Sequence, residues 1–246
     1  MPRAATAAKT VAPSSPLPAS QRRAPAGARS EQRVRDILRT GRTVFAELGY
    51  ERATTGEIAR RLGVSEATVF TYFATKRELC LRVISDWYAE ITASLAEGMP
   101  LDKPLHEQFR WFVRTHLELF LVEGTGLCAL VLSEGRGKNH GGHGDLGEVL
   151  VELQRRYTAP LMDLLARGRA SGELRDDVSL SLMRGLVLGP VEHLLWELVS
   201  AGKSVDVTAA AHDLVALVWP VLCKPGEELR RLRALRDSLG QALAAS

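Results

Sequence analysis

The stretch TTGEIARRLGVSEATVFTYFATKREL, Thr54–Leu79, contains two short helices and the start of a third. Three signals for the start of a helix occur in it: capping boxes at Thr54/Glu57 and Thr75/Glu78, and an N-cap at Ser65. Gly63 is the signal for the end of a helix, because glycine suits the left-handed turn that follows one. A helix of about two turns, such as 65–72, is unstable alone because nucleation costs more than two turns return. We therefore expect neighbouring helices to hold it and to leave its outer face free for another molecule.

The two short helices, 55–62 and 65–72, have the lengths and the glycine bend of a helix-turn-helix. The side chains expected to face the preceding helix are Ala59, Leu62, Val64, Val69 and Phe73. Their burial stabilises the short helix by roughly 1.5 to 3 kcal/mol per large side chain. The side chains left largely outside are Glu66, Ala67, Thr68, Phe70, Thr71 and Tyr72. Small and polar groups at the start of such a helix can approach base edges in a major groove.

The rest of the chain is also helical in pattern, because apolar residues recur at spacings of three and four and no strand pattern is found. The expected helices run from Ser30 to Gly49, from Thr75 to Gly98, over 105–122, 127–133, 147–169, 178–200 and 206–222, and after Pro225. Pro160 is expected to kink the 147–169 helix, and kinked helices form cavities and hinges. The predicted fold class is all-α.

The first 29 residues differ in composition from the remainder. They are rich in Ala, Pro, Ser and Arg without periodicity, which predicts a disordered basic arm, 1–29. An organelle transit peptide has a similar composition, but the prolines there oppose an amphipathic helix. Residues 1–30 carry no acid, although the whole chain has a net charge of only +3. The N-terminal part therefore suits a polyanion such as nucleic acid.

Composition limits the compartment and the chemistry. No apolar run approaches the roughly 20 residues of a membrane span, and no secretory signal is present, which predicts a cytoplasmic protein without membrane contact. Cys80, Cys128 and Cys223 are widely spaced in apolar pattern, which indicates buried reduced thiols. No nucleophile elbow, Walker lysine, HExxH or paired carboxylate occurs in a suitable context, so neither an enzyme nor a cofactor is expected.

The quoted stretch resembles the DNA-binding signature of the TetR family of bacterial transcriptional regulators. The resemblance rests on IARRLGVS, on the aromatic pair at Tyr72 and Phe73 and on Lys76 opening the next helix, and it covers residues 31–79. The phrase GRASGELRDD before a long helix is also common in that family. The resemblance implies a DNA-binding domain at 30–79 and a larger helical domain at 80–246 that binds an effector and dimerises.

The resemblance also assigns contacts to DNA. It implies phosphate contacts by Thr55, Ser65, Tyr72 and Lys76, and places Ala67, Thr68 and Thr71 nearest the bases. Two positions depart from the family pattern, Glu66 and Phe70, which leaves the operator sequence open. Glu66 either favours the helix N-terminus through the dipole or accepts a hydrogen bond from cytosine N4. We prefer the first of these interpretations.

A homodimer is expected because one helix-turn-helix recognises only a few base pairs and a two-fold axis gives a palindromic site. The interface candidates are Leu182, Leu186, Gly189, Leu194, Val215 and Trp219, with an ordinary intramolecular core as the alternative. The candidates for an effector pocket are Trp111, Phe112, His116, Phe120, Leu130, Tyr157, Leu161, Leu165, His193 and Trp196, which would also suit a helical core. Family members that regulate lipid metabolism bind acyl-CoA, so the resemblance implies an apolar acyl effector.

The loop Glu134–Glu148 contains two further patterns. Gly142, Gly144 and Gly147 spell GxGxxG, but no strand precedes them, so a dinucleotide site is not predicted. The HxxH pair of His140 and His143 is a weak metal candidate on a glycine-rich loop, and a mobile loop is the preferred interpretation. The sequence predicts a ligand-responsive repressor. The alternative is an all-helical protein-interaction module without DNA binding.

Overall fold

The computed structural model describes residues 27–124, 126–128, 131, 145–201, 206–224 and 226–244. The helices are α1 Ala28–Arg52, α2 Thr55–Leu62, α3 Glu66–Tyr72, α4 Lys76–Gly98, α5 Leu105–Glu118, the π-helix η1 Leu119–Glu123, α7 Asp145–Tyr157, α8 Ala159–Ala170, α9 Leu180–Ala201, α10 Val207–Leu222 and α11 Glu227–Ala244. Residues 126–128 and 131 are helical as well. In these ranges the β-type pairing is an isolated bridge between Leu174 and Cys223. The prediction of an all-α fold is confirmed.

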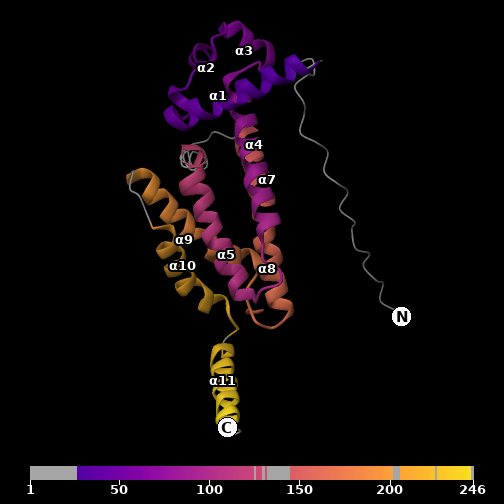
Figure 1. Ribbon diagram of the computed structural model, residues 1–246, viewed down its shortest axis with the longest axis vertical. Helices are drawn as coiled ribbons and strands as arrows, with labels where there is room; N and C mark the ends of the chain where they lie inside the picture. The colour runs from indigo at the N-terminus through magenta and orange to yellow at the C-terminus, as the bar shows by residue number, and fades with distance from the viewer. Residues whose placement is uncertain are drawn as a thin grey trace, which may run out of the picture.

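Helices α1, α2 and α3 form a head at one end of the molecule (Figure 1). The head has its own apolar centre, in which Phe45, Ile58 and Val69 are fully buried. Regular helical geometry in α1 is interrupted at Gly49, with φ 71° and ψ 173°, where the sequence predicted a stop. One further turn then leads to α2.

Helix α4 connects the head to the remaining helices, which we call the body. It packs against α1 at its start and against α7 further along, and Figure 1 shows it running from the head into the body. Leu79, Ile84, Trp87 and Leu95 are buried along its length, so one continuous core joins the two parts. Helix α4 spans the predicted domain boundary at residues 79/80 and belongs to both sides of it.

The body is built around α5, which packs against α8 and α10. Its buried face includes Phe109, Phe112, Val113 and Leu117. Helix α9 packs against α8 and α10. Helix α11 projects from the end of the body opposite the head (Figure 1). Its Arg231 pairs with Glu173 at 2.5 Å.

The helix predicted over 147–169 is two helices. Helix α7 ends at Tyr157 and α8 starts at Ala159, with Pro160 in its first turn. A proline in a first turn removes an N–H that would have no helical partner. At the place of the expected kink the helix is interrupted for one residue, Thr158, whose hydroxyl donates to the Gln154 carbonyl at 2.8 Å.

Several predictions concern residues outside the described ranges. These are most of the basic arm, the glycine-rich loop with His140 and His143, and the pocket candidate Leu130. Among the described residues, no group of three or more His, Cys, Asp or Glu side chains could hold a metal ion. None of the helices described is long and apolar enough to cross a membrane. Cys80 and Cys128 are buried, and Cys223 is partly buried.

Candidate nucleic-acid interface and ligand site

The starts of α2 and α3 are fixed by the N-cap residues that the sequence predicted. The Thr54 hydroxyl accepts from the Glu57 N–H at 3.0 Å, and the Ser65 hydroxyl accepts from the Thr68 N–H at 3.3 Å. Gly63 has φ 66°, a left-handed conformation that L side chains adopt only with strain. The bend between α2 and α3 therefore has the predicted chemistry.

Helix α3 is held by its buried side and exposes the other. Val69 is fully buried, whereas Ala67 and Thr71 are exposed and Thr68 is half-buried. The Thr71 hydroxyl donates to the Ala67 carbonyl at 3.0 Å. Its proton is thus used within the helix, which leaves the Thr71 methyl group available for an outside contact. The candidate base-contacting residues are accessible, as the sequence predicted.

Two predicted phosphate or base contacts bind each other instead. Thr55 is buried, and its hydroxyl donates to the Glu66 carboxylate. The same carboxylate lies over the first turn of α2, because a Cβ added at Gly56 would be 3.6 Å from it. The Glu66 charge therefore favours the start of α2 as well as that of α3. The sequence analysis did not foresee this pairing, which withdraws the Thr55 hydroxyl from phosphate.

Lys76 also has an internal partner. Its Nζ donates to the carbonyl of Tyr50 at 2.9 Å, of Ala53 at 3.1 Å and of Glu51 at 3.4 Å, and lies 4.4 Å from the Tyr50 ring centroid. An ammonium group has three protons, and three carbonyls at the end of α1 receive them. Lys76 therefore closes the C-terminal end of α1.

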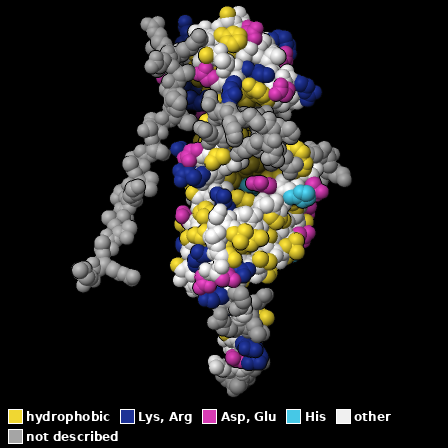
Figure 2. All heavy atoms as spheres, turned by 180° about the vertical axis from the view of Figure 1, so that it is seen from behind, with side chains coloured by type: hydrophobic (Ala, Val, Ile, Leu, Met, Phe, Trp, Pro, Cys, Tyr) yellow, Lys and Arg dark blue, Asp and Glu magenta, His cyan; other side chains and the backbone are white. Residues whose placement is uncertain are grey.

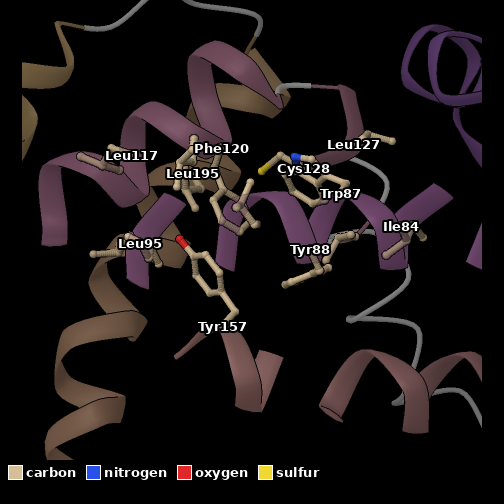
Figure 3. Close-up of a cluster of buried hydrophobic side chains, with 14 of the residues drawn as sticks. Ile84, Trp87, Tyr88, Leu95, Leu117, Phe120, Leu127, Cys128, Tyr157 and Leu195 are labelled. Carbon is tan, nitrogen blue, oxygen red and sulfur yellow. The ribbon is translucent and has the colours of Figure 1, made fainter. Parts of the chain in front are cut away.

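The body contains a buried aromatic cluster, part of which Figure 3 shows. The Tyr157 hydroxyl lies 2.9 Å from His116 Nδ1, and the Phe120 ring stacks on the His116 ring at 4.6 Å. Four of the predicted pocket residues meet in this cluster: Phe112, His116, Phe120 and Tyr157. Trp87, Tyr88 and Cys128 belong to the same region and were not predicted, because core spacing alone does not separate them from other buried residues of α4.

Burial keeps this cluster uncharged. It lowers the pKa of His116 to about 3, raises the pKa of Tyr157 well above its ordinary value, and raises the pKa of the Cys128 thiol to about 12. Two nitrogen atoms in the cluster, Trp87 Nε1 and His116 Nε2, are buried without a hydrogen-bond partner in the described part of the chain. The site is therefore neutral, aromatic and incompletely hydrogen-bonded.

The other pocket candidates lie elsewhere. Leu161 and Leu165 are buried in α8, and Trp196 is half-buried in α9. His193 is on the surface, with a side chain that is 70% exposed, so it does not line an internal site. Trp111 faces an open hollow of about 380 Å³ between α5 and α10.

The interface candidates divide into two sets. Leu182 and Gly189 are exposed on α9, and Leu186 and Leu194 are half-buried there (Figure 2 shows apolar side chains on one face of the body). Val215 and Trp219 are instead buried within the chain, and the Trp219 ring lies 5.3 Å from the Phe109 ring. Two exposed apolar residues of α10, Leu217 and Val221, were not among the predicted interface candidates. Because α10 is apolar on several sides, its composition does not reveal which side faces outward.

This arrangement defines a class of protein. A capped helix-turn-helix, with the outer face of its second helix exposed on a small head and a larger helical body behind it, is the architecture of a DNA-binding transcriptional regulator. Residues 37–83 match the family model described as bacterial regulatory proteins, tetR family. The head of this chain is thus the DNA-binding module of the TetR family of transcriptional regulators.

Individual relatives agree with this assignment. The fatty acid metabolism regulator protein of Bacillus subtilis is 22% identical over 71% of this chain and 88% of its own length. The transcriptional repressor AcnR of Corynebacterium diphtheriae is 24% identical over 74% of this chain and 89% of its own. The structure of FadR from Bacillus subtilis in complex with stearoyl-CoA has a TM-score of 0.66 at 20% identity, covering 75% of this chain and 96% of that one. Both curated relatives are regulators by name, and residues 37–83 of this chain match the model of a family of regulatory proteins.

Proposed function

We propose that the protein is a cytoplasmic, ligand-responsive repressor that binds a palindromic operator as a homodimer and is released by a small apolar effector. Residues 30–79 would bind DNA, residues 80–246 would bind the effector and dimerise, and residues 1–29 would form a basic arm. The observation that carries this proposal is the exposed face of α3 above fully buried Val69. The repressor named among the relatives supports the direction of regulation.

Base recognition would depend on methyl groups. Ala67 and Thr71 are exposed on α3, and the Thr71 hydroxyl is already bonded to the helix backbone. A methyl surface of this kind suits the 5-methyl group of thymine in the major groove. Ser65 and Tyr72 remain the proposed phosphate contacts. Thr55 and Lys76 would act indirectly, by positioning α2, α3 and the end of α1.

The proposed dimer uses the outward faces of α9 and α10. Exposed Leu182, Leu217 and Val221 form an apolar surface there, with Gly189 allowing close approach. The half-buried Leu186 and Leu194 would contribute to the edge of this apolar surface. Leu217 and Val221 replace Val215 and Trp219 in the predicted set, because the latter are used inside the protomer.

The proposed effector site is the aromatic cluster of the body. It lies in the interior between the head and the far helices and brings together four residues predicted to line a pocket. The related FadR structure is a complex with stearoyl-CoA, which supports an acyl compound as the apolar effector here.

A direct route links this cluster to the head. A Cβ at Gly124 would lie 2.6 Å from Trp87 Cζ2, and a Cβ at Gly126 would overlap the backbone of Ala46 in α1. The segment that follows Phe120 is thus in close contact with both the cluster and α1. A coupling free energy of about 1 to 3 kcal/mol between effector binding and DNA binding, transmitted through this segment, would be enough to change the occupancy of the operator.

A gel shift with genomic fragments at two ionic strengths tests the proposal. Phosphate contacts make the affinity of a DNA-binding protein fall steeply as salt rises. We expect the wild-type dimer to bind a DNA duplex in a salt-dependent way, and we expect a long-chain acyl-CoA to abolish that binding. Absence of any salt-dependent duplex binding would favour the alternative, an all-helical protein-interaction module.

A further inference from the structure

Two polar atoms in the middle of the body have no hydrogen-bond partner among the residues that the structure describes. Trp87 Nε1 and His116 Nε2 are both buried, and among the described residues neither makes a hydrogen bond. Buried polar groups in native proteins are nearly all hydrogen-bonded, because an unpaired one loses its hydration without compensation. Each of these two nitrogens, which belong to one aromatic cluster, therefore lacks a polar partner in the described part of the chain.

Both nitrogens are donors. Trp87 Nε1 carries a proton by its chemistry. Burial raises the pKa of Tyr157, so its hydroxyl keeps its proton, and the described acceptor for that proton is His116 Nδ1 at 2.9 Å. Burial also lowers the pKa of His116 to about 3, so at neutral pH the ring has one proton, which then lies on Nε2. The missing partner is therefore an acceptor.

Phe120 adjoins the side chains of both Trp87 and His116. Its ring lies 4.6 Å from the His116 ring and 5.2 Å from the Trp87 ring, measured between centroids, so it touches both donor-bearing side chains. It belongs to η1, a five-residue π-helix that continues α5. Such π turns are rare and occur frequently at functional sites.

We propose that the effector carries a neutral carbonyl group on an apolar body, and that it displaces the Phe120 ring so that the carbonyl oxygen accepts from Trp87 Nε1–H and His116 Nε2–H. A carbonyl oxygen has two lone pairs and can accept both protons. Ketones, esters and thioesters share this chemistry. The inference rests on the proposed ligand-responsive function and specifies the chemical class of its effector.

The same two donors disfavour other ligands. The rings of Trp87, Tyr88, Phe120 and Tyr157 lie within 5.2 to 5.9 Å of one another in successive pairs, which would suit a quaternary ammonium ion. Two N–H groups directed at a cation would oppose it. A plain hydrocarbon would fit the apolar walls but leave both donors unpaired.

Proton–nitrogen NMR of the full-length, ¹⁵N-labelled protein tests this directly. The chain has four tryptophans, and Trp87→Phe identifies the indole signal of residue 87. The probes are 2-tridecanone, its hydrocarbon counterpart tridecane, and tetramethylammonium. We expect the ketone to move the Trp87 indole proton downfield, while tridecane and tetramethylammonium leave it in place.

Affinity measurements on variants separate hydrogen bonding from packing. Trp87→Phe and His116→Leu should each weaken ketone binding about three- to tenfold relative to tridecane, the effect of one net hydrogen bond. Phe109→Leu alters a buried ring of α5 that packs on Trp219 at 5.3 Å, outside the aromatic cluster, and removes no donor, so it should leave the ketone-to-tridecane ratio unchanged. Phe120→Ala removes the displaced ring and should bind the ketone at least about tenfold more tightly than the wild type.

The inference is overturned if the Trp87 signal stays in place at saturating ketone, if both donor variants keep the wild-type ketone-to-tridecane ratio, or if neither the wild type nor Phe120→Ala binds the ketone. A downfield shift with tetramethylammonium would equally contradict it. None of these readouts involves DNA. Normal operator binding with any of these results rejects the carbonyl site alone, whereas absence of operator binding rejects the proposed function.

Discussion

Replacement of Lys76 by alanine separates two roles for this side chain. In the structure, Lys76 Nζ donates to three carbonyls at the end of α1, at 2.9, 3.1 and 3.4 Å. Hydrogen bonds to a charged group each contribute about 1.5 to 3 kcal/mol when buried. Lys76 is half-buried, so we expect the free energy of unfolding to fall by about 2 to 3 kcal/mol in total. For a chain of this size the melting temperature should then fall by about 4 to 12 °C.

The assay combines thermal unfolding with a salt titration of duplex binding. Lys103→Ala is the matched control, because Lys103 is an exposed lysine paired with the neighbouring Asp102 at 3.5 Å. That control should change stability by less than about 0.5 kcal/mol. If Lys76→Ala unfolds like the wild type but lowers the slope of log affinity against log salt by about one, Lys76 contacts a phosphate and its structural role is refuted.

Three further predictions concern the route to the head, the cluster and the dimer. The Cβ that Gly126→Ala adds should displace Ala46 and with it α1, and so weaken duplex binding about tenfold without effector. Gly240→Ala, whose Cβ meets open space, should have no effect, and equal duplex binding by both variants in a gel shift would refute the route. In the unfolded state His116 binds a proton below about pH 6.5, whereas burial lowers its pKa in the folded state to about 3. The free energy of unfolding should therefore fall by up to about 1.4 kcal/mol per pH unit on acidification through that window. Denaturant titrations of His116→Phe should lack this contribution, and a pH profile equal to that of the wild type would refute it. Leu217→Glu places a charge on the proposed dimer surface and should yield monomers in light scattering. Leu101→Glu, at another largely exposed leucine, should keep the wild-type mass. A dimeric Leu217→Glu protein would exclude the outward face of α10 as the dimer interface.

The local features of the head could be predicted from the sequence. The caps at Thr54, Ser65 and Thr75 and the turn at Gly63 depend on residues within four positions of each other, and all four have the expected geometry. The burial of Val69 followed from the same short pattern. Such features need only backbone geometry and hydrogen-bonding groups that neighbours in sequence supply.

The partners of the polar residues could not be predicted. Thr55 and Glu66 are eleven positions apart, and Lys76 reaches carbonyls 23 to 26 positions earlier in the chain. Such contacts exist only once α1, α2 and α4 have packed together. A side chain that the family resemblance places near phosphate can therefore be used inside the head instead.

The faces of the body helices were equally ambiguous. Trp219 packs on Phe109 while Leu217, two residues earlier, is 72% exposed, although both belong to one apolar run. Likewise His116 is buried and His193 is exposed, although each follows helical spacing in an apolar segment. Periodicity locates a helix, but in a helix that is apolar on several sides only tertiary packing decides which side is inside.

The central claim is that α3 recognises bases through its exposed methyl groups, and selection of binding sites from random duplexes tests it most directly. Thr71→Ser removes one methyl group, while Thr43→Ser makes the same change on α1, where the exposed Thr43 hydroxyl likewise donates to a carbonyl four residues earlier. We predict a palindromic motif for the wild type and for Thr43→Ser, and loss of the thymine preference at one position in each half-site for Thr71→Ser. An identical motif from all three proteins, or no motif from any of them, would contradict the assignment of α3 as the base-contacting helix.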